Sequence, residues 1–148
     1  MAGDKDYLDF SNVQKITEIR HEALDEEFRR FPGVFAFWAT QEAESRGKVL
    51  VTKAQMEQTY AKLATEHRGK ADYHKIKVTE GQIEEKVTQE PDYMQAKVVF
   101  NKAQGDALRI SAVVSALEKK GDMLKQLGFT RSQELARLSD SVPAVQKK

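Results

Sequence analysis

Apolar residues recur at helical spacing along most of the chain, and this pattern is its strongest structural signal. A first helix is expected from Ser11, a residue type favoured at helix N-caps, to Phe31, with Pro32-Gly33 ending it. From Val34 to about Arg68 no proline intervenes and helix-forming residues dominate, which predicts one long helix. The stripe of the first helix consists of Val13, Ile16, Ala23, Leu24, Phe28 and Phe31.

The helical pattern lapses between residues 69 and 77, which predicts a positively charged loop. Thr79-Glu-Gly-Gln82 then has the form of a capping box and should open a short helix that runs through Val87. Pro91 suits the first position of the next helix, because its missing N–H has no helical partner there.

A second long helix is expected from Asp92 to about Leu127, with Gly128 as its C-cap. A second capping-box sequence, Thr130 to Gln133, should open a terminal helix that ends near Leu138. Gly105 and Gly121 each weaken the long helix, so each is a point of close approach or a soft spot. Its apolar seam consists of Ala96, Val99, Ala103, Ile110, Val113, Leu117, Leu124 and Leu127.

These elements predict an all-α fold in which two long helices form an antiparallel hairpin with shorter flanking helices. We expect an acidic N-terminal segment at residues 1–10, a single helical domain at residues 11–138, and a polar C-terminal tail at residues 139–148. Long hairpins expose much side surface, so a homo-oligomer is favoured. The apolar residues expected at its interface are Phe35, Phe37, Trp38, Ile110, Val113 and Leu117.

Composition narrows the classes of function. The 148 residues include no cysteine, which excludes disulfides, thiol catalysis and cysteine-ligated zinc, and favours a cytoplasmic protein. The acidic N-terminus lacks the apolar run of a signal peptide, and no stretch is apolar enough to span a membrane, so we expect neither export by a signal peptide nor membrane association. His21-Glu22 begins a zinc-helix motif, but Asp25 stands where the second histidine belongs. No nucleophile and base are paired, so we expect neither an enzyme nor a cofactor or metal.

The formal net charge of +1 conceals an uneven distribution. Residues 1–27 carry eight acids and three bases, residues 62–77 carry five bases and two acids, and residues 79–92 carry five acids and one base. An acidic segment of one copy can therefore meet the basic segment of another copy.

The basic stretch is the candidate binding site. Lysine and arginine side chains neutralise phosphates, and interleaved aromatic rings offer surfaces on which unpaired bases stack, a combination typical of sites for single-stranded nucleic acid. An ordinary solvated, lysine-rich turn is the alternative. The candidate DNA-binding residues are Lys62, Arg68, Lys70, Lys75, Lys77, Tyr60 and His67, with Tyr73 among them in the sequence.

The order of elements resembles the family of phage recombination mediators typified by UvsY. The resemblance begins at Phe37-Trp38 and follows the long helix to Tyr60-Ala-Lys-Leu63 and the polar break. It continues through the short helix from Gly81 to Thr88 and the long helix from Asp92, which ends in Lys125-Gln-Leu-Gly-Phe129. Roughly residues 35–135 take part.

The resemblance implies a helical protomer that assembles into a ring, binds single-stranded DNA, and contacts a RecA-like recombinase and a single-strand-binding protein, without catalysis. If the chain is phage-encoded, it would act in the cytoplasm of the host cell. The family places basic side chains at the segment matching Tyr60 to Leu63, where only Lys62 carries over and Tyr60 occupies another basic position. The first helix, from Ser11 to Phe31, is longer than the family norm. The alternative is an oligomeric helical adaptor or chaperone that binds a protein through Phe35, Phe37 and Trp38 and does not bind DNA.

Overall fold

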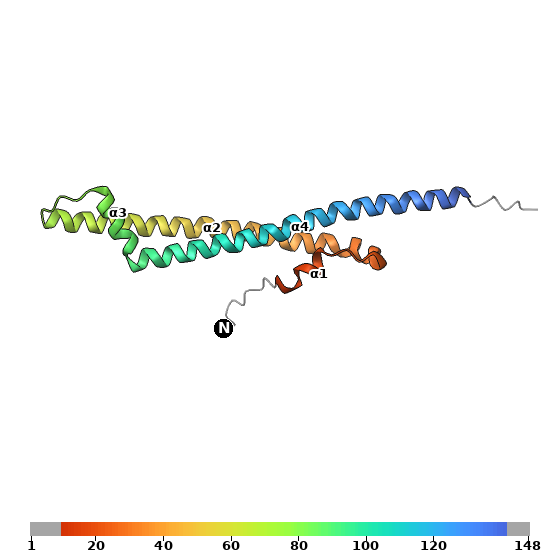
Figure 1. Ribbon diagram of the computed structural model, residues 1–148, viewed down its shortest axis with the longest axis horizontal. Helices are drawn as coiled ribbons and strands as arrows, with labels where there is room; N and C mark the ends of the chain where they lie inside the picture. Colours follow the sequence, from red (N-terminus) through yellow and green to blue (C-terminus); the bar gives the residue numbers. More distant parts are fainter. Residues whose placement is uncertain (1–9, 142–148) are drawn as a thin grey trace, which may run out of the picture. The chain divides into compact units, whose positions relative to one another are not determined.

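The computed structural model describes residues 10–141, and every regular element within them is helical (Figure 1). This confirms the all-α fold with two long helices and shorter ones. Apart from Phe10, the expected N-terminal segment lies outside the described residues, as does the expected tail beyond residue 141. The elements are a 3₁₀ turn (Phe10–Asn12), α1 (Val13–Thr17), a second 3₁₀ turn (His21–Ala23), α2 (Leu24–Tyr73), α3 (Glu80–Gln89) and α4 (Pro91–Ser141).

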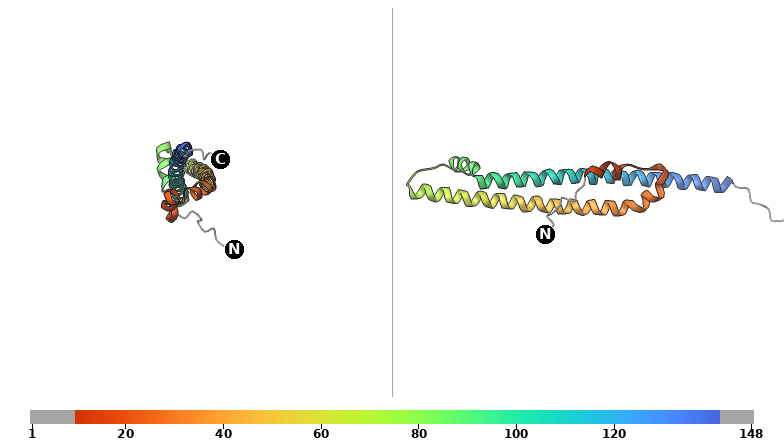
Figure 2. Two further views of the ribbon diagram at one scale, coloured as in Figure 1. Left: turned by 90° about the vertical axis from the view of Figure 1, so that its right-hand side faces the viewer. Right: turned by 90° about the horizontal axis from the view of Figure 1, so that it is seen from below.

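The chain divides into two compact units. The first comprises Met1–Trp38 and Ala112–Lys148, and the second comprises Ala39–Ser111, so α2 and α4 each contribute to both. Within each unit the segments of α2 and α4 run side by side and antiparallel (Figures 1 and 2). The boundaries expected for a single domain at residues 11–138 stay a prediction.

The first helix expected from Ser11 to Phe31 does not form as one element. α1 ends at Thr17, whose hydroxyl donates to the carbonyls of Val13 and Gln14, and Glu18 is extended. The extended residues bring the Arg20 guanidinium to within 2.8 Å of a Glu27 carboxylate oxygen, a contact that an unbroken helix would not make. Tertiary pairing therefore overrides the helical pattern here.

Pro32-Gly33 does not end a helix, because α2 continues through both residues. Proline inside a helix costs about 3 kcal/mol through a lost hydrogen bond and a clash with the preceding turn. Packing on either side offsets this cost: Phe31 and Phe35 stack at a ring-centroid distance of 5.8 Å, and Trp38 is only 5 % exposed. Burial of this aromatic stretch decides the course of the chain.

The connection between the long helices follows the expected plan, with shifted bounds. α2 extends to Tyr73, so residues 69–73, expected in the loop, are helical. The capping box is confirmed, because the Thr79 hydroxyl accepts from the Gln82 N–H and the Gln82 side chain accepts from the Thr79 N–H. Pro91 opens α4, as expected.

Gly128 is not a C-cap, and no separate terminal helix forms, because α4 runs unbroken to Ser141. Gly121 and Gly128 instead admit rings from α2 in the first unit. A Cβ at Gly121 would lie 2.9 Å from Phe31 Cζ, and one at Gly128 would lie 3.2 Å from Phe28 Cζ. Gly121 is therefore the expected point of close approach, whereas Gly105 faces open space.

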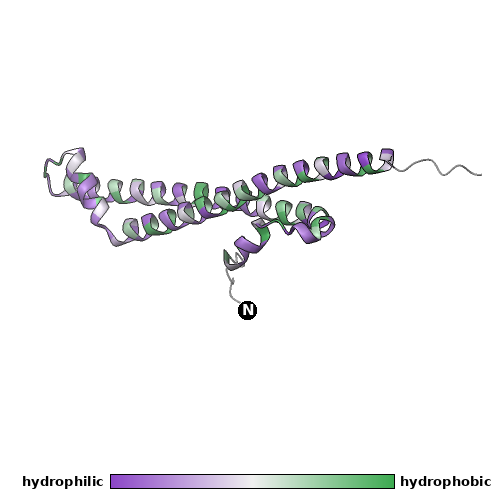
Figure 3. Cartoon of the chain, turned by 45° about the vertical axis from the view of Figure 1, so that its right-hand side comes forward, coloured by the Kyte–Doolittle hydropathy of each residue, from purple (hydrophilic) through white to green (hydrophobic). Residues whose placement is uncertain are grey.

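Each unit buries its own apolar side chains. In the second unit, α2 and α3 form a cluster of Leu63, Ala64, Ile83 and Val87, against which Tyr60, Val78 and Tyr93 pack. In the first unit, the buried apolar residues are Trp38, Val113, Val114, Leu117 and Leu124. Hydrophilic and hydrophobic residues are interspersed along both long helices (Figure 3). From Phe129 to Ser141, α4 has no buried residue.

Candidate nucleic-acid interface

The candidate interface lies in the second unit, where α2 ends and the chain turns toward α3. The Ile76 N–H donates to the Ala71 carbonyl, and the Lys75 N–H donates to the Asp72 carbonyl. This pair of bonds is a Schellman motif, in which the residue after the cap takes a left-handed conformation. That residue is Lys75, with φ of 52°, where glycine is usual.

Two side chains of α2 tie this end to the following elements. Arg68 donates twice to Glu80, at 3.2 and 2.6 Å, and this hydrogen-bonded pair lowers the pKa of the Glu80 carboxyl. His67 Nε2 lies 2.9 Å from a carboxylate oxygen of Glu90. The acidic stretch after the turn thus neutralises part of the basic stretch within one chain, so these pairs need no second copy.

Four lysines of the basic stretch remain exposed, and none of them forms an ion pair with any residue from 10 to 141. Lys75 and Lys77 line one hollow of 580 Å³ together with Arg68 and its partner Glu80. These are the side chains that the fold brings together. The four lysines are Lys62, Lys70, Lys75 and Lys77.

Lys62 lies apart from this hollow. It lines a different one, of 710 Å³, together with Glu66 and Asp92. Two carboxylates outnumber the single cation of this hollow, whereas the three cations of the hollow at the turn outnumber its two carboxylates, Asp72 and Glu80. The turn therefore holds the more strongly positive part of the basic stretch.

The two candidate tyrosines differ in exposure. Tyr60 packs on the cluster of α2 and α3 and lies edge-on to Tyr93 at a ring-centroid distance of 5.8 Å. Tyr73 is 83 % exposed and meets His74 edge-to-face at 5.1 Å. Tyr60 therefore serves packing, and the open aromatic surface is at Tyr73.

The residues expected at an oligomer interface are mostly covered within the protomer. Trp38, Ile110, Val113 and Leu117 are at most 5 % exposed, and Phe35 is half-buried. Phe37 is 47 % exposed. The fold alone accounts for the apolar character of the covered residues, and the interface stays a prediction.

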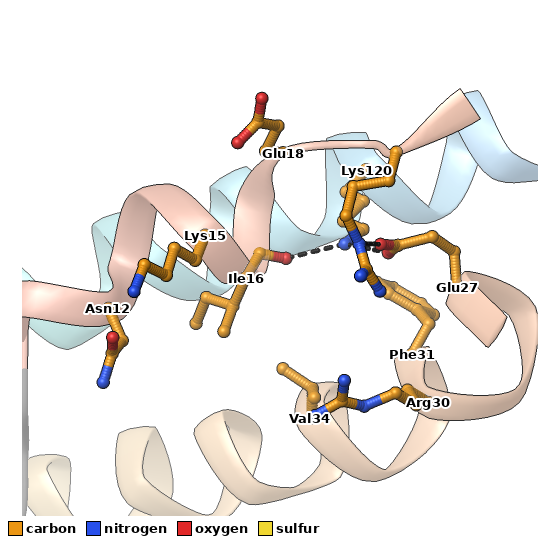
Figure 4. Close-up of a pocket in the computed structure, with 10 residues that line it drawn as sticks. Asn12, Lys15, Ile16, Glu18, Glu27, Arg30, Phe31, Val34 and Lys120 are labelled. Atoms are coloured by element: carbon orange, nitrogen blue, oxygen red, sulfur yellow. Dashed lines mark hydrogen bonds and ion pairs between the residues drawn. The ribbon is translucent and has the colours of Figure 1, made fainter. Parts of the chain in front are cut away.

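The first unit contains a buried charge cluster that the sequence did not single out. The ammonium of Lys120 lies 2.5 Å from Glu27 Oε2 and donates to the Ile16 carbonyl at 2.8 Å (Figure 4). Arg20 donates to the other Glu27 oxygen at 2.8 Å. These residues border a 470 Å³ pocket with Ile16, Phe31 and Val34 as its apolar lining.

Sequence reasoning had no local signal for this cluster, because Lys120 and Ile16 are 104 positions apart. Arg68 and Glu80 are 12 positions apart, but the opposite charges of their segments were visible in the sequence. Among residues 10–141 no group of histidines and carboxylates could hold a metal ion. The described helices include none that is long and apolar enough to cross a membrane.

Comparison with known proteins adds one fold relationship. No protein-family model and no curated protein sequence matches the chain. The fold is similar to that of the bacteriophage T4 recombination mediator protein UvsY in its crystal structure, with a TM-score of 0.65. The alignment covers 84 % of this chain and 94 % of that one, at 14 % identity. The likeness implied by the sequence is thus confirmed for the fold.

Proposed function

We propose that the protein is a recombination mediator that binds single-stranded DNA and helps to load a RecA-like recombinase, without catalysis. The observation that carries this proposal is the fold similarity to UvsY, a recombination mediator protein. The lysines at the turn between α2 and α3 are exposed and form no ion pair with any residue from 10 to 141. They support the proposal, because phosphate contacts supply most of the affinity for nucleic acid that does not depend on sequence.

In this mechanism the turn holds DNA by its phosphates. Lys70, Lys75 and Lys77 supply the charge, and Lys62 contributes less because Glu66 and Asp92 share its hollow. Arg68 and His67 act mainly by fixing the turn through Glu80 and Glu90. Other surfaces contact the recombinase and the single-strand-binding protein.

We also propose that the protein acts as a homo-oligomer, arranged as a ring. A ring repeats the modest positive charge of each turn, and simultaneous engagement of several turns raises the overall affinity without any new contact. Phe37 is the exposed member of the proposed interface set.

The test is fluorescence anisotropy of a labelled oligo-dT across a salt series, with the mass of the protein measured in the same buffer. We expect a multimer whose logarithmic affinity falls linearly with the logarithm of salt concentration. Absence of binding at low salt would refute the DNA-binding function and favour the helical adaptor. The burial of Trp38 leaves that adaptor a smaller apolar surface than the sequence suggested.

A further inference from the structure

Lys75, the residue after the cap of α2, has a backbone conformation that favours glycine. Lys75 occupies the left-handed position of the Schellman motif, with φ of 52°. Residues with a Cβ are strained there, and glycine is the usual occupant. Glycine at this position would therefore make the fold more stable, but it would lack the ammonium group.

Packing does not explain the large side chains of the neighbouring residues either. Tyr73 is 83 % exposed and Ile76 is 59 % exposed, although both are large and apolar for the most part. His74 is also exposed and braces the Tyr73 ring edge-to-face at 5.1 Å. An exposed aromatic pair between cations makes no contribution to a core, but it offers a surface for a planar ligand.

We infer that Tyr73 is a base-stacking residue for single-stranded nucleic acid and that Lys75 binds the flanking phosphate. This inference rests on the proposed function and places the contact with a DNA base at the C-terminal end of α2. His74 is a positioning residue that acts through the Tyr73 ring.

The ligand chemistry follows from the side chains. A tyrosine ring stacks on any base face, which requires that the base be unpaired, as in a single strand. Lys70, Lys75 and Lys77 flank Tyr73 in the sequence and are exposed, so they can supply charge to the phosphates next to a stacked base. A duplex presents phosphates but no free base face, so it gains only the lysine contacts.

The experiment for Tyr73 compares oligo-dT with an abasic strand of the same length and backbone, both labelled and titrated with the full-length protein. We expect the wild type to bind oligo-dT at least about 5-fold more tightly, since one stacked base is worth about 1–3 kcal/mol. Tyr73→Phe, the matched control, should keep this preference because its ring still stacks. Tyr73→Ala should bind the two strands about equally while its salt dependence stays that of the wild type.

The experiment for Lys75 uses Lys75→Gly, which removes the charge and relieves the backbone. We expect its melting temperature to rise by about 2 °C or more. The slope of the salt dependence on oligo-dT should flatten by about 0.7, the loss of one phosphate contact on a single strand. A purely structural lysine would give the rise in melting temperature with no change in slope.

The outcomes separate this inference from the proposed function. A wild type that binds both strands equally, or a Tyr73→Ala variant that keeps the preference for oligo-dT, would overturn the stacking role and leave DNA binding intact. An unchanged slope in Lys75→Gly would overturn the phosphate role. If the wild type binds neither strand at low salt, the proposed function and this inference both fail.

Discussion

The carboxylate of Glu27 accepts from the Lys120 ammonium at 2.5 Å, and both residues are only 6 % exposed. The same ammonium donates to the carbonyl of Ile16, so one cation joins α1, α2 and α4 within the first unit. A buried charge is tolerated only when it is paired and hydrogen-bonded, and here each partner completes the other.

Removing one partner of this pair should therefore destabilise the protein strongly. We expect Lys120→Met to lower the free energy of unfolding by about 3 kcal/mol, because it leaves the Glu27 carboxylate buried with Arg20 alone. The double variant Glu27→Leu with Lys120→Met should recover much of that loss. Urea unfolding measures both, with exposed Lys119→Ala as the control. A double variant as unstable as the sum of its single variants would contradict this account.

The same pair sets a dependence on pH. Burial alone would raise the pKa of the Glu27 carboxyl, but hydrogen bonds and charges from Lys120 and Arg20 outweigh it, so the pKa lies below its ordinary value of 4.5. The stability that this group contributes is complete above the pKa of the unfolded state and is lost as the pH falls below about 4.5 through the folded value. Urea unfolding in acid should show a smaller loss in Glu27→Gln than in the wild type, and equal losses would contradict the assignment.

Two glycines of α4 should respond to alanine with opposite signs. Gly105→Ala faces open space and should raise the free energy of unfolding by up to about 1 kcal/mol through helix propensity. Gly121→Ala places its Cβ 2.9 Å from Phe31 Cζ, and the displaced ring should make it destabilising by about 1 kcal/mol. Thermal unfolding of the two alanine variants compares them directly. If both substitutions stabilise the protein, the Phe31 ring moves aside without loss of stability.

Trp38, the single tryptophan, reports on the packing of Phe10. Its ring lies 5.8 Å from that of Phe10, and it is 5 % exposed. Phe10→Ala should open one side of the indole, increasing acrylamide quenching and shifting its emission to the red. The loss of stability should be about 1–2 kcal/mol, because Phe10 is half-buried. Unchanged quenching would mean that this aromatic contact does not form in solution.

The lysines of the turn should contribute to DNA binding more than equally exposed lysines elsewhere. Lys70→Ala with Lys77→Ala should flatten the salt slope on oligo-dT by about 1.4, the loss of two phosphate contacts. Lys97→Ala with Lys102→Ala removes the same charge from exposed positions of α4 and is the matched control. Equal effects of the two double variants would point to unspecific attraction by net charge.

The sequence predicted elements best where one local signal decides them. The Thr79–Gln82 capping box and Pro91 work through contacts within one turn, and both are found where they were expected. Pro32-Gly33 does not end the helix because the aromatic residues beside it in the sequence pack and offset its cost, and Gly128 does not end one because it packs against Phe28. Phe28 and Phe31 meet the glycines of α4 about a hundred positions away, and no local pattern encodes that distance.

The candidate site was predictable in composition but not in detail. The excess of lysine was visible, whereas the pairing of Arg68 with Glu80 and the packing of Tyr60 on Tyr93 depend on how α3 folds back. The left-handed Lys75 was unforeseeable, because the usual sign of that conformation is a glycine.

The last turns of α4 belong to one continuous helix but need not unfold together with the core. From Phe129 to Ser141 no residue is buried, and the ion pair of Arg131 with Asp25 of α2 is exposed. This segment is therefore helical mainly because each turn adds to the one before it. Such a segment can fray from its end without loosening the core that contains Leu117 and Leu124. Amide hydrogen exchange would therefore divide one continuous helix into a slowly exchanging part and a rapidly exchanging one, with no break in the ribbon to mark the border.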